Sequence, residues 1–157
     1  MAQGAGDDLS SDQYAALAAF RYRLRRFLAF SEAAAAREGL PPQQHQALLA
    51  LAGHRGEGAP TVGFLAEQLL IAPHTAAELV SRMVEGGLLT KARGTEDRRR
   101  VELALTPRAE ALLRGLTAAH LAELRGLEPA LRAVLRESLP GAPRGGIERG
   151  GRARVEA

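Results

Sequence analysis

The chain has 157 residues, of which 46% are hydrophobic and 25% charged, and its formal net charge is +3. This length suits one domain with a proper core, and the composition is ordinary for a globular protein. The chain has no cysteine, which excludes disulfides, thiolate metal sites and thiol-based redox sensing. No apolar run approaches the ~20 residues that span a bilayer, and the acidic start lacks the apolar segment of a secretory signal. We therefore expect a cytoplasmic protein.

Residues 1–9 are small and polar and are expected to be disordered. Residues 10–38 then show a long helical pattern, which we expect to be a dimerisation helix because so long a stripe exceeds what one small domain can bury. Four arginines crowd the other faces, and a solvated face explains them better than phosphate contact. The stripe consists of Leu17, Phe20, Leu24, Phe27 and Leu28, continued by Ala34 and Ala35.

Gly39 is expected to end this helix, and Pro41 and Pro42 to begin a second one that turns Ala47, Leu48 and Leu51 inward. Residues 53–59 form a loop.

The next helix is short and begins at Thr61, whose hydroxyl can cap its first turn. Leu65, Leu69 and Leu70 recur along it at helical spacing, and Ile71-Ala72 interrupts the pattern. Pro73 then suits the first turn of a further helix because its missing N–H has no partner there. Two helices joined by so short a turn predict a helix-turn-helix.

On the helix that starts at Pro73, one face is apolar at the i, i+3, i+4, i+7 spacing of an amphipathic segment and is formed by Ala76, Leu79, Val80 and Met83. Gly86-Gly87 is expected to end the helix in a left-handed conformation. The outward face is polar and is the candidate recognition surface. It comprises His74, Thr75, Ala77, Glu78, Ser81 and Arg82.

A hairpin is predicted next, with one strand over Leu88–Ala92 and a second in which Val101, Leu103 and Leu105 alternate with Glu102 and Ala104. The intervening RGTEDRRR holds a glycine for the turn and too many charges to be buried. Its candidate nucleic-acid contacts are Arg93, Asp97, Arg98, Arg99 and Arg100. From Pro73 to Arg100 six basic residues oppose four acidic ones, so the local charge is 6 − 4 = +2. A hairpin this basic directly after a helix-turn-helix predicts a winged helix-turn-helix.

Three segments carry a family resemblance: LPPQQHQALLAL, LAEQLLIAPHTAAELVSRMVEGGLL and the wing EDRRRVELALT. They resemble the DNA-binding core of the multiple antibiotic resistance regulator (MarR) family over roughly Leu40 to Leu113. The resemblance implies a mainly α fold with a small β-wing, in which residues 40–106 form the DNA-binding region. It also implies a homodimer that binds an inverted-repeat operator in double-stranded DNA, and repression as the commoner outcome.

The resemblance further implies that Arg99, the arginine of Asp-x-Arg, enters the minor groove, and that Asp97 holds neighbouring arginines. Two residues depart from the family pattern. Glu78 would repel phosphates, and Phe64 stands where a polar residue is common.

After the wing, Thr106-Pro107 reads as a cap followed by a proline at the first helical position. Residues 107–138 then predict either two C-terminal dimerisation helices or one helix kinked near Gly126 and Pro129. Residues 139–157 are rich in glycine and arginine without periodicity, and we expect them to be disordered.

Family members commonly bind a small aromatic or phenolic effector between the dimerisation helices and the DNA-binding lobe. The candidates for such a crevice are Phe20, Phe27, Phe30, His45 and His54, each of which is also explained as a core or surface residue. The histidines have no short-range metal spacing, so we expect neither a metal nor a cofactor.

Two other classes of function were weighed. The chain lacks a phosphate-cradling glycine loop, a paired histidine–glutamate metal motif and a hydrolase-type serine turn, so an enzyme is not expected. A winged helix used only for protein–protein contact remains the alternative to a DNA-binding regulator.

Overall fold

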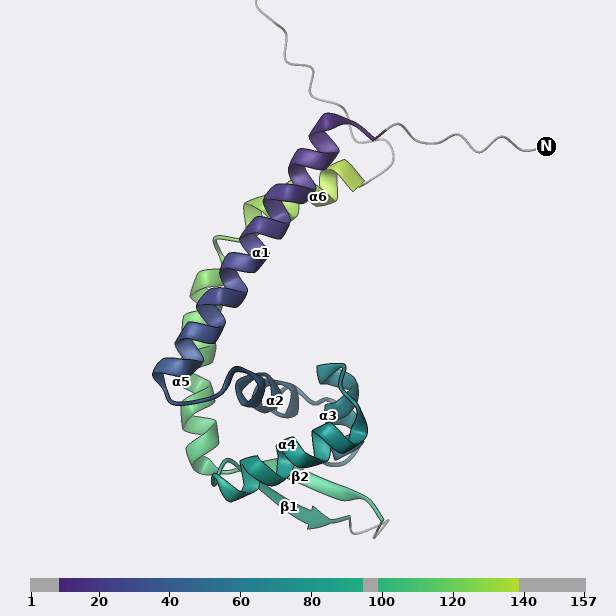
Figure 1. The fold of residues 1–157 in the computed structure, drawn as a ribbon, viewed down its shortest axis with the longest axis vertical. Coiled ribbons are helices and arrows are strands. Elements are labelled where there is room, and N and C mark those ends of the chain that lie inside the picture. Colours follow the sequence, from purple (N-terminus) through teal and green to yellow (C-terminus); the bar gives the residue numbers. More distant parts are fainter. Residues whose placement is uncertain (1–8, 95–98, 139–157) are drawn as a thin grey trace, which may run out of the picture.

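The computed structural model describes residues 9–94 and 99–138, which form a helical arm and a smaller lobe (Figure 1). The arm consists of α1 (Ser11–Arg37), α5 (Pro107–Leu124) and α6 (Glu128–Ser138). The lobe consists of α2 (Pro42–Ala52), α3 (Val62–Leu69), α4 (Pro73–Glu85) and the antiparallel strands β1 (Leu89–Arg93) and β2 (Val101–Leu105). The prediction of a mainly α winged helix is confirmed. The disorder predicted for residues 1–9 and 139–157 lies outside the described residues except at Leu9, which is exposed and belongs to no helix or strand.

Local capping explains where α1 begins and ends. The Ser10 hydroxyl accepts from the Gln13 amide at 3.2 Å, and the Gln13 side chain accepts from the Ser10 amide at 2.7 Å, which is a capping box. At the other end Gly39 takes a φ of +68°, and the Leu40 amide donates to the Ala35 carbonyl at 2.9 Å. The α1 helix therefore occupies the range predicted for it to within one residue at each end.

The core lies mainly in the lobe and extends to the lobe ends of α1 and α5. Its largest fully buried side chains are Leu48, Leu65, Leu79, Val80, Met83, Leu89 and Leu103. The inward positions predicted for the second helix, Ala47, Leu48 and Leu51, are all buried, and Pro41 caps that helix without a side-chain hydrogen bond. The amphipathic spacing read in the sequence thus locates the core correctly.

The turn between α3 and α4 differs from the prediction at one residue. Thr61 does cap α3, because its hydroxyl accepts from the Phe64 amide at 3.2 Å. The helix ends at Leu69, however, and Leu70 takes a left-handed φ of +54° with 92% of its surface exposed. Leu70 therefore does not extend the apolar stripe. The amide of Ile71 donates to the Ala66 carbonyl at 3.1 Å, so the turn closes the helix end while the Leu70 side chain points outward.

The end of α4 also decides where the first strand begins. Gly86 stays in a right-handed conformation with a φ of −76°, and only Gly87 takes a positive φ, +69°. The Leu88 amide then donates to the Met83 carbonyl at 2.8 Å and so belongs to the helix cap. The strand predicted over Leu88–Ala92 accordingly runs one residue later, and Leu89 pairs with Leu105 while Arg93 pairs with Val101.

Thr106 joins the lobe to the arm. Its hydroxyl accepts from the Ala109 amide at 3.2 Å, which caps α5, and donates to the Gly87 carbonyl at 2.8 Å. Arg108 donates to the Gly86 carbonyl at 3.0 Å. Higher up, α5 ends at Leu124 and α6 follows as a separate helix packed along α1. Residues 107–138 were predicted to form either two helices or one kinked helix, and the structure has two helices. No helix in the described part of the chain is long and apolar enough to cross a membrane.

Candidate nucleic-acid interface

The α4 helix divides into a buried face and an exposed one. Ala76, Leu79, Val80 and Met83 are between 0% and 2% exposed and fix the helix against the lobe. Of the six outward positions predicted from the sequence, Thr75 is half-buried, and the other five are exposed: His74, Ala77, Glu78, Ser81 and Arg82. The packing therefore leaves one rigid, polar side of α4 available along the edge of the lobe (Figure 1).

The N-terminus of α4 adds a partial positive charge to this side. Its first turn contains no acidic residue, and Ala72 provides no side-chain cap. The first backbone N–H groups of a helix lack intrahelical partners, and the aligned peptide dipoles favour an anion there. The exposed carboxylate of Glu78, on the next turn, is the only negative charge among the six positions.

The ribbon places a set of cations beside α4. Lys91 and Arg93 on β1 and Arg99 and Arg100 before β2 are all exposed. The Gly94 amide donates to the Arg100 carbonyl at 2.9 Å and closes the described part of the tip. Asp97 and Arg98, two of the predicted wing contacts, lie outside the described residues. Lys91 was missed in the sequence, although its position in an amphipathic edge strand next to the arginines was available as a signal.

The five candidates for an effector crevice do not share one site. Phe27 and Phe30 contact the ring of His120 on α5, with centroids at 5.8 and 5.5 Å, and His45 contacts the same ring at 4.8 Å. His54 instead contacts the ring of Phe64 at 4.5 Å, in a shallow hollow between α2 and α3. Phe20 lies half-buried farther along α1.

Burial lowers the pKa of His45 from its ordinary value of 6.5, and the nearby His120 lowers it further. His45 is only 3% exposed, so a charge on its ring would lose most of its hydration. This neutral ring therefore belongs to the packed junction of α1, α2 and α5.

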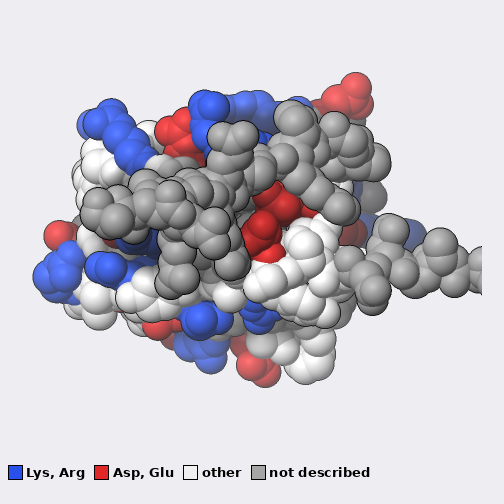
Figure 2. Space-filling view, turned by 90° about the horizontal axis from the view of Figure 1, so that it is seen from above, with Lys and Arg blue, Asp and Glu red and all other residues white. Residues whose placement is uncertain are grey.

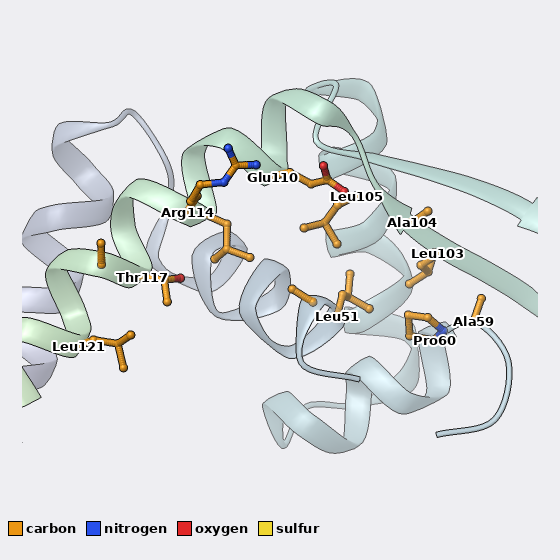
Figure 3. Close-up of a pocket in the computed structure, with 13 residues that line it drawn as sticks. Leu51, Ala59, Pro60, Leu103, Ala104, Leu105, Glu110, Arg114, Thr117 and Leu121 are labelled. Atoms are coloured by element: carbon orange, nitrogen blue, oxygen red, sulfur yellow. The ribbon is translucent and has the colours of Figure 1, made fainter. Parts of the chain in front are cut away.

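A pocket of about 860 Å³ opens elsewhere, between α2, β2 and α5 (Figure 3). Its walls are mostly small and aliphatic, while Glu110, Arg114 and Thr117 supply polar groups from α5. The residues that line it are Leu51, Ala52, Ala59, Pro60, Leu103, Ala104, Leu105, Glu110, Leu113, Arg114, Thr117, Ala118 and Leu121. Sequence reasoning missed this pocket because it looked for aromatic residues, whereas the walls are leucines and alanines that also read as ordinary core.

Charge elsewhere is mixed. Seen from above, along the arm, blue and red side chains alternate around the visible rim without gathering in one patch (Figure 2). Within residues 9–94 and 99–138, no group of three or more histidine or acidic side chains could hold a metal ion. On the lobe, α4 and the ribbon together form a surface that combines an exposed helix face with clustered cations.

These features define a class: a winged helix-turn-helix mounted on a three-helix arm. The model of the MarR family matches residues 38–100, which cover α2 to the ribbon tip. Over these residues the chain is similar to the MarR family, and its fold is that of MarR family transcriptional regulators of known structure. Members of this family are transcription regulators rather than enzymes.

Solved structures share the architecture well beyond the matched segment. A *S. aureus* MepR variant has a TM-score of 0.64 at 18% identity, covering 76% of this chain and 92% of that one. AbsC, a MarR family transcriptional regulator from Streptomyces coelicolor, has a TM-score of 0.62 at 20% identity, covering 78% and 82%. BpsR from Bordetella bronchiseptica has a TM-score of 0.57 at 21% identity, covering 75% and 88%. No curated protein matches the chain in sequence.

Proposed function

We propose that the chain is a homodimeric transcriptional repressor that binds an inverted-repeat operator in double-stranded DNA through α4 and the ribbon. The observation that carries the proposal is the pairing of a rigid, exposed polar face on α4 with exposed cations on the adjacent ribbon. A structure of a *S. aureus* MepR variant similar to this chain, with a TM-score of 0.59, was solved with a bound oligodeoxyribonucleotide, which supports the same use of the fold here.

In this proposal α4 enters the major groove. Its 13 residues span about 20 Å at 1.5 Å per residue, which suits one groove crossing. Thr75 can hydrogen-bond a base or pack its methyl on thymine, and Glu78 can accept from cytosine N4 while rejecting other bases. Ser81 and Arg82, a turn later, are placed for contacts with phosphates or with the ribbon.

The ribbon contributes affinity rather than base discrimination. Arg99 enters the minor groove, whose negative potential is strongest where it is narrow. Lys91, Arg93 and Arg100 neutralise phosphates, each neutralised phosphate releasing counterions. The proposal extends to Asp97 and Arg98 as the remaining wing positions.

The arm provides the dimer. Large apolar side chains along it stay exposed in the single chain: Tyr14, Leu17, Tyr22, Leu28, Leu121, Leu124, Leu131 and Leu135. A second copy covering them would set two α4 helices in successive major grooves about 34–36 Å apart.

The pocket between α2, β2 and α5 is the proposed effector site. Its apolar walls suit an aromatic ring, and Arg114 with Thr117 suits a carboxylate or phenolic oxygen at the rim (Figure 3). BpsR, one of the similar structures, has its DNA binding regulated by 6-hydroxynicotinic acid. A small aromatic or phenolic ligand here would touch both the arm and the lobe, and so alter the position of α4 relative to its partner.

The test is a mobility shift and footprint on the promoter DNA that flanks the protein's own gene, at about 50 and 200 mM salt. We expect a protected inverted repeat whose affinity falls steeply with salt, since counterion release makes phosphate contacts salt-dependent. Binding insensitive to salt, or no specific fragment in a genome-wide selection of bound DNA, would overturn the proposal in favour of a winged helix that contacts only protein.

A further inference from the structure

Two of the chain's four histidines meet in the interior where the arm joins the lobe. His45 on α2 is 3% exposed and His120 on α5 is 8% exposed. Their ring centroids lie 4.8 Å apart, with the planes tilted by 48°. Because α2 belongs to the lobe and α5 to the arm, this ring contact crosses the junction between them.

The hydrogen bonds of His120 define the tautomer of its neutral ring. Its Nδ1 faces the Leu116 carbonyl, which can only accept, so Nδ1 carries the proton. Its Nε2 lies 2.7 Å from the Ser31 hydroxyl and accepts from it when the ring is neutral. Phe27 and Phe30 of α1 close the other sides of the ring. The neutral form of His120 is thus fully satisfied by the surrounding protein.

Among the described residues, no buried acidic side chain lies beside the pair to compensate an added positive charge. The elements packed against α2 are α1, α3, α5 and β2. Every ionisable side chain of those elements is exposed, apart from His120 itself and the half-buried Glu102, which lies in the ribbon opposite Ala92. The α2 helix has no ionisable side chain besides His45. The only salt bridge found between described residues, Arg132–Glu128, is within α6. An imidazolium at His45 would therefore face a second imidazole and apolar walls.

We propose that His45 and His120 form a proton-sensitive joint, through which acidification loosens the lobe from the arm. A protonated His45 must regain hydration, and the direct route is to open the contact between α2 and α5. The inference concerns the fold alone and does not depend on the function proposed above.

The direction of the pH effect follows from linkage. Burial and His120 lower the pKa of His45 below its ordinary value of 6.5, so the unfolded chain takes up this proton at a higher pH than the folded one. Stability from the neutral pair is fully present above about pH 6.5 and is lost as the pH falls below it. Within that window one such group changes the folding equilibrium constant by at most about tenfold per pH unit.

Urea unfolding of the full chain between about pH 5 and 8 tests the joint. The wild type should lose stability below pH 6.5, and His45→Gln should be less stable at pH 8 but lose much of that acid-induced slope. His74→Gln, which changes an exposed histidine on α4, is the matched control and should keep the wild-type slope. An unchanged slope in His45→Gln would overturn the proposal.

Imidazole titration by NMR on the wild type decides the question even where His45→Gln does not fold. His54→Gln and His74→Gln assign two of the four ring signals, which leaves those of the buried pair. We expect a signal from the pair to titrate below the ordinary histidine range. If both remaining signals titrate within the ordinary histidine range, the proposed joint is contradicted.

Hydrogen exchange separates a loosened joint from general destabilisation. Between about pH 8 and pH 5, after correction for intrinsic exchange rates, the amides of α2 and of α5 around Leu116 should lose protection before those of α4 and β1. A uniform loss across the lobe would show that acid acts elsewhere. None of these measurements uses DNA, so failure of the joint and failure of the DNA-binding proposal are distinguishable.

Discussion

The lobe and the arm contain similar numbers of leucines, but the lobe buries most of its leucines whereas the arm buries few. In the lobe, α4 alone buries four side chains to 2% exposure or less. In the arm, α6 has an amphipathic pattern yet buries no residue, and the 27-residue α1 buries only Ala34 and Ala35 at its lobe end. Amphipathic periodicity is as clear in α6 as in α4, so it identifies a face to be covered without saying whether the same chain covers it. The lobe buries its apolar faces within one chain, whereas the arm leaves apolar side chains exposed, which is what the proposed dimer would cover.

The largest expected effect is the loss of stability caused by creating a cavity in the lobe. Leu79→Ala removes a side chain that is 1% exposed, and we expect unfolding to become easier by about 2–5 kcal/mol in urea titrations. Leu49→Ala on α2 is the matched control, because Leu49 is 48% exposed and should cost less than about 1 kcal/mol. Equal losses for both leucines would mean that the lobe is not packed as described.

An arm substitution should act on assembly instead. Leu131→Asp changes a residue that is 38% exposed in the single chain, and we expect the dimer to dissociate at least tenfold more readily, about 1.4 kcal/mol. Sedimentation equilibrium measures this, with Arg136→Ser on another face of α6 as the control. The comparison fails if Leu131→Asp leaves the association constant unchanged.

Within the lobe, helix and ribbon should divide affinity and specificity. Arg99→Ala should weaken binding to all operator variants by roughly 1–3 kcal/mol, because it removes a groove contact shared by every sequence. Thr75→Ala should instead change which variant is preferred. Binding isotherms on a set of single-base operator variants would separate these outcomes, and equal losses from both substitutions on every variant would contradict the division.

The smallest expected effect concerns Leu70, the described non-glycine residue with a positive φ. A left-handed conformation costs an L-residue roughly 1–2 kcal/mol, while glycine loses about 0.5–1 kcal/mol of chain entropy. Leu70→Gly should therefore raise the unfolding free energy by up to about 1.5 kcal/mol. Leu70→Ala keeps the strain and should show no such gain. A less stable glycine variant would mean that the exposed leucine makes a stabilising contact.

Features that depend on interactions between residues close in the sequence can be predicted from the sequence. The period of Ala76, Leu79, Val80 and Met83, the Thr61 cap and the Gly87 turn all act within a few residues, and the structure agrees with each. Leu70 was misread because a leucine at helical spacing does not reveal that its backbone turns left-handed. The first strand was placed one residue early because the bond from Leu88 to Met83 assigns Leu88 to the helix cap.

The pocket could not be predicted for a different reason. Leu51, Leu103 and Leu113 come from three distant segments, and each fits an ordinary core position. Only the angle at which α5 leaves the lobe opens a space between them. The predicted roles of individual recognition and wing residues remain predictions, since they depend on bound DNA.

Thr106 and Arg108 connect the base of α5 to the C-terminal end of α4. Both side chains bond the backbone at the C-terminal end of α4, so the base of α5 and the end of the proposed recognition helix move together. The 18 residues of α5 extend about 27 Å, so a tilt of about 5° displaces its far end by roughly 2 Å. By the same geometry, a shift of about 2 Å at the far end of α5 would tilt α5 and, through these two hydrogen bonds, the end of α4. Thr106 is therefore a point at which a movement of the arm would be passed to α4.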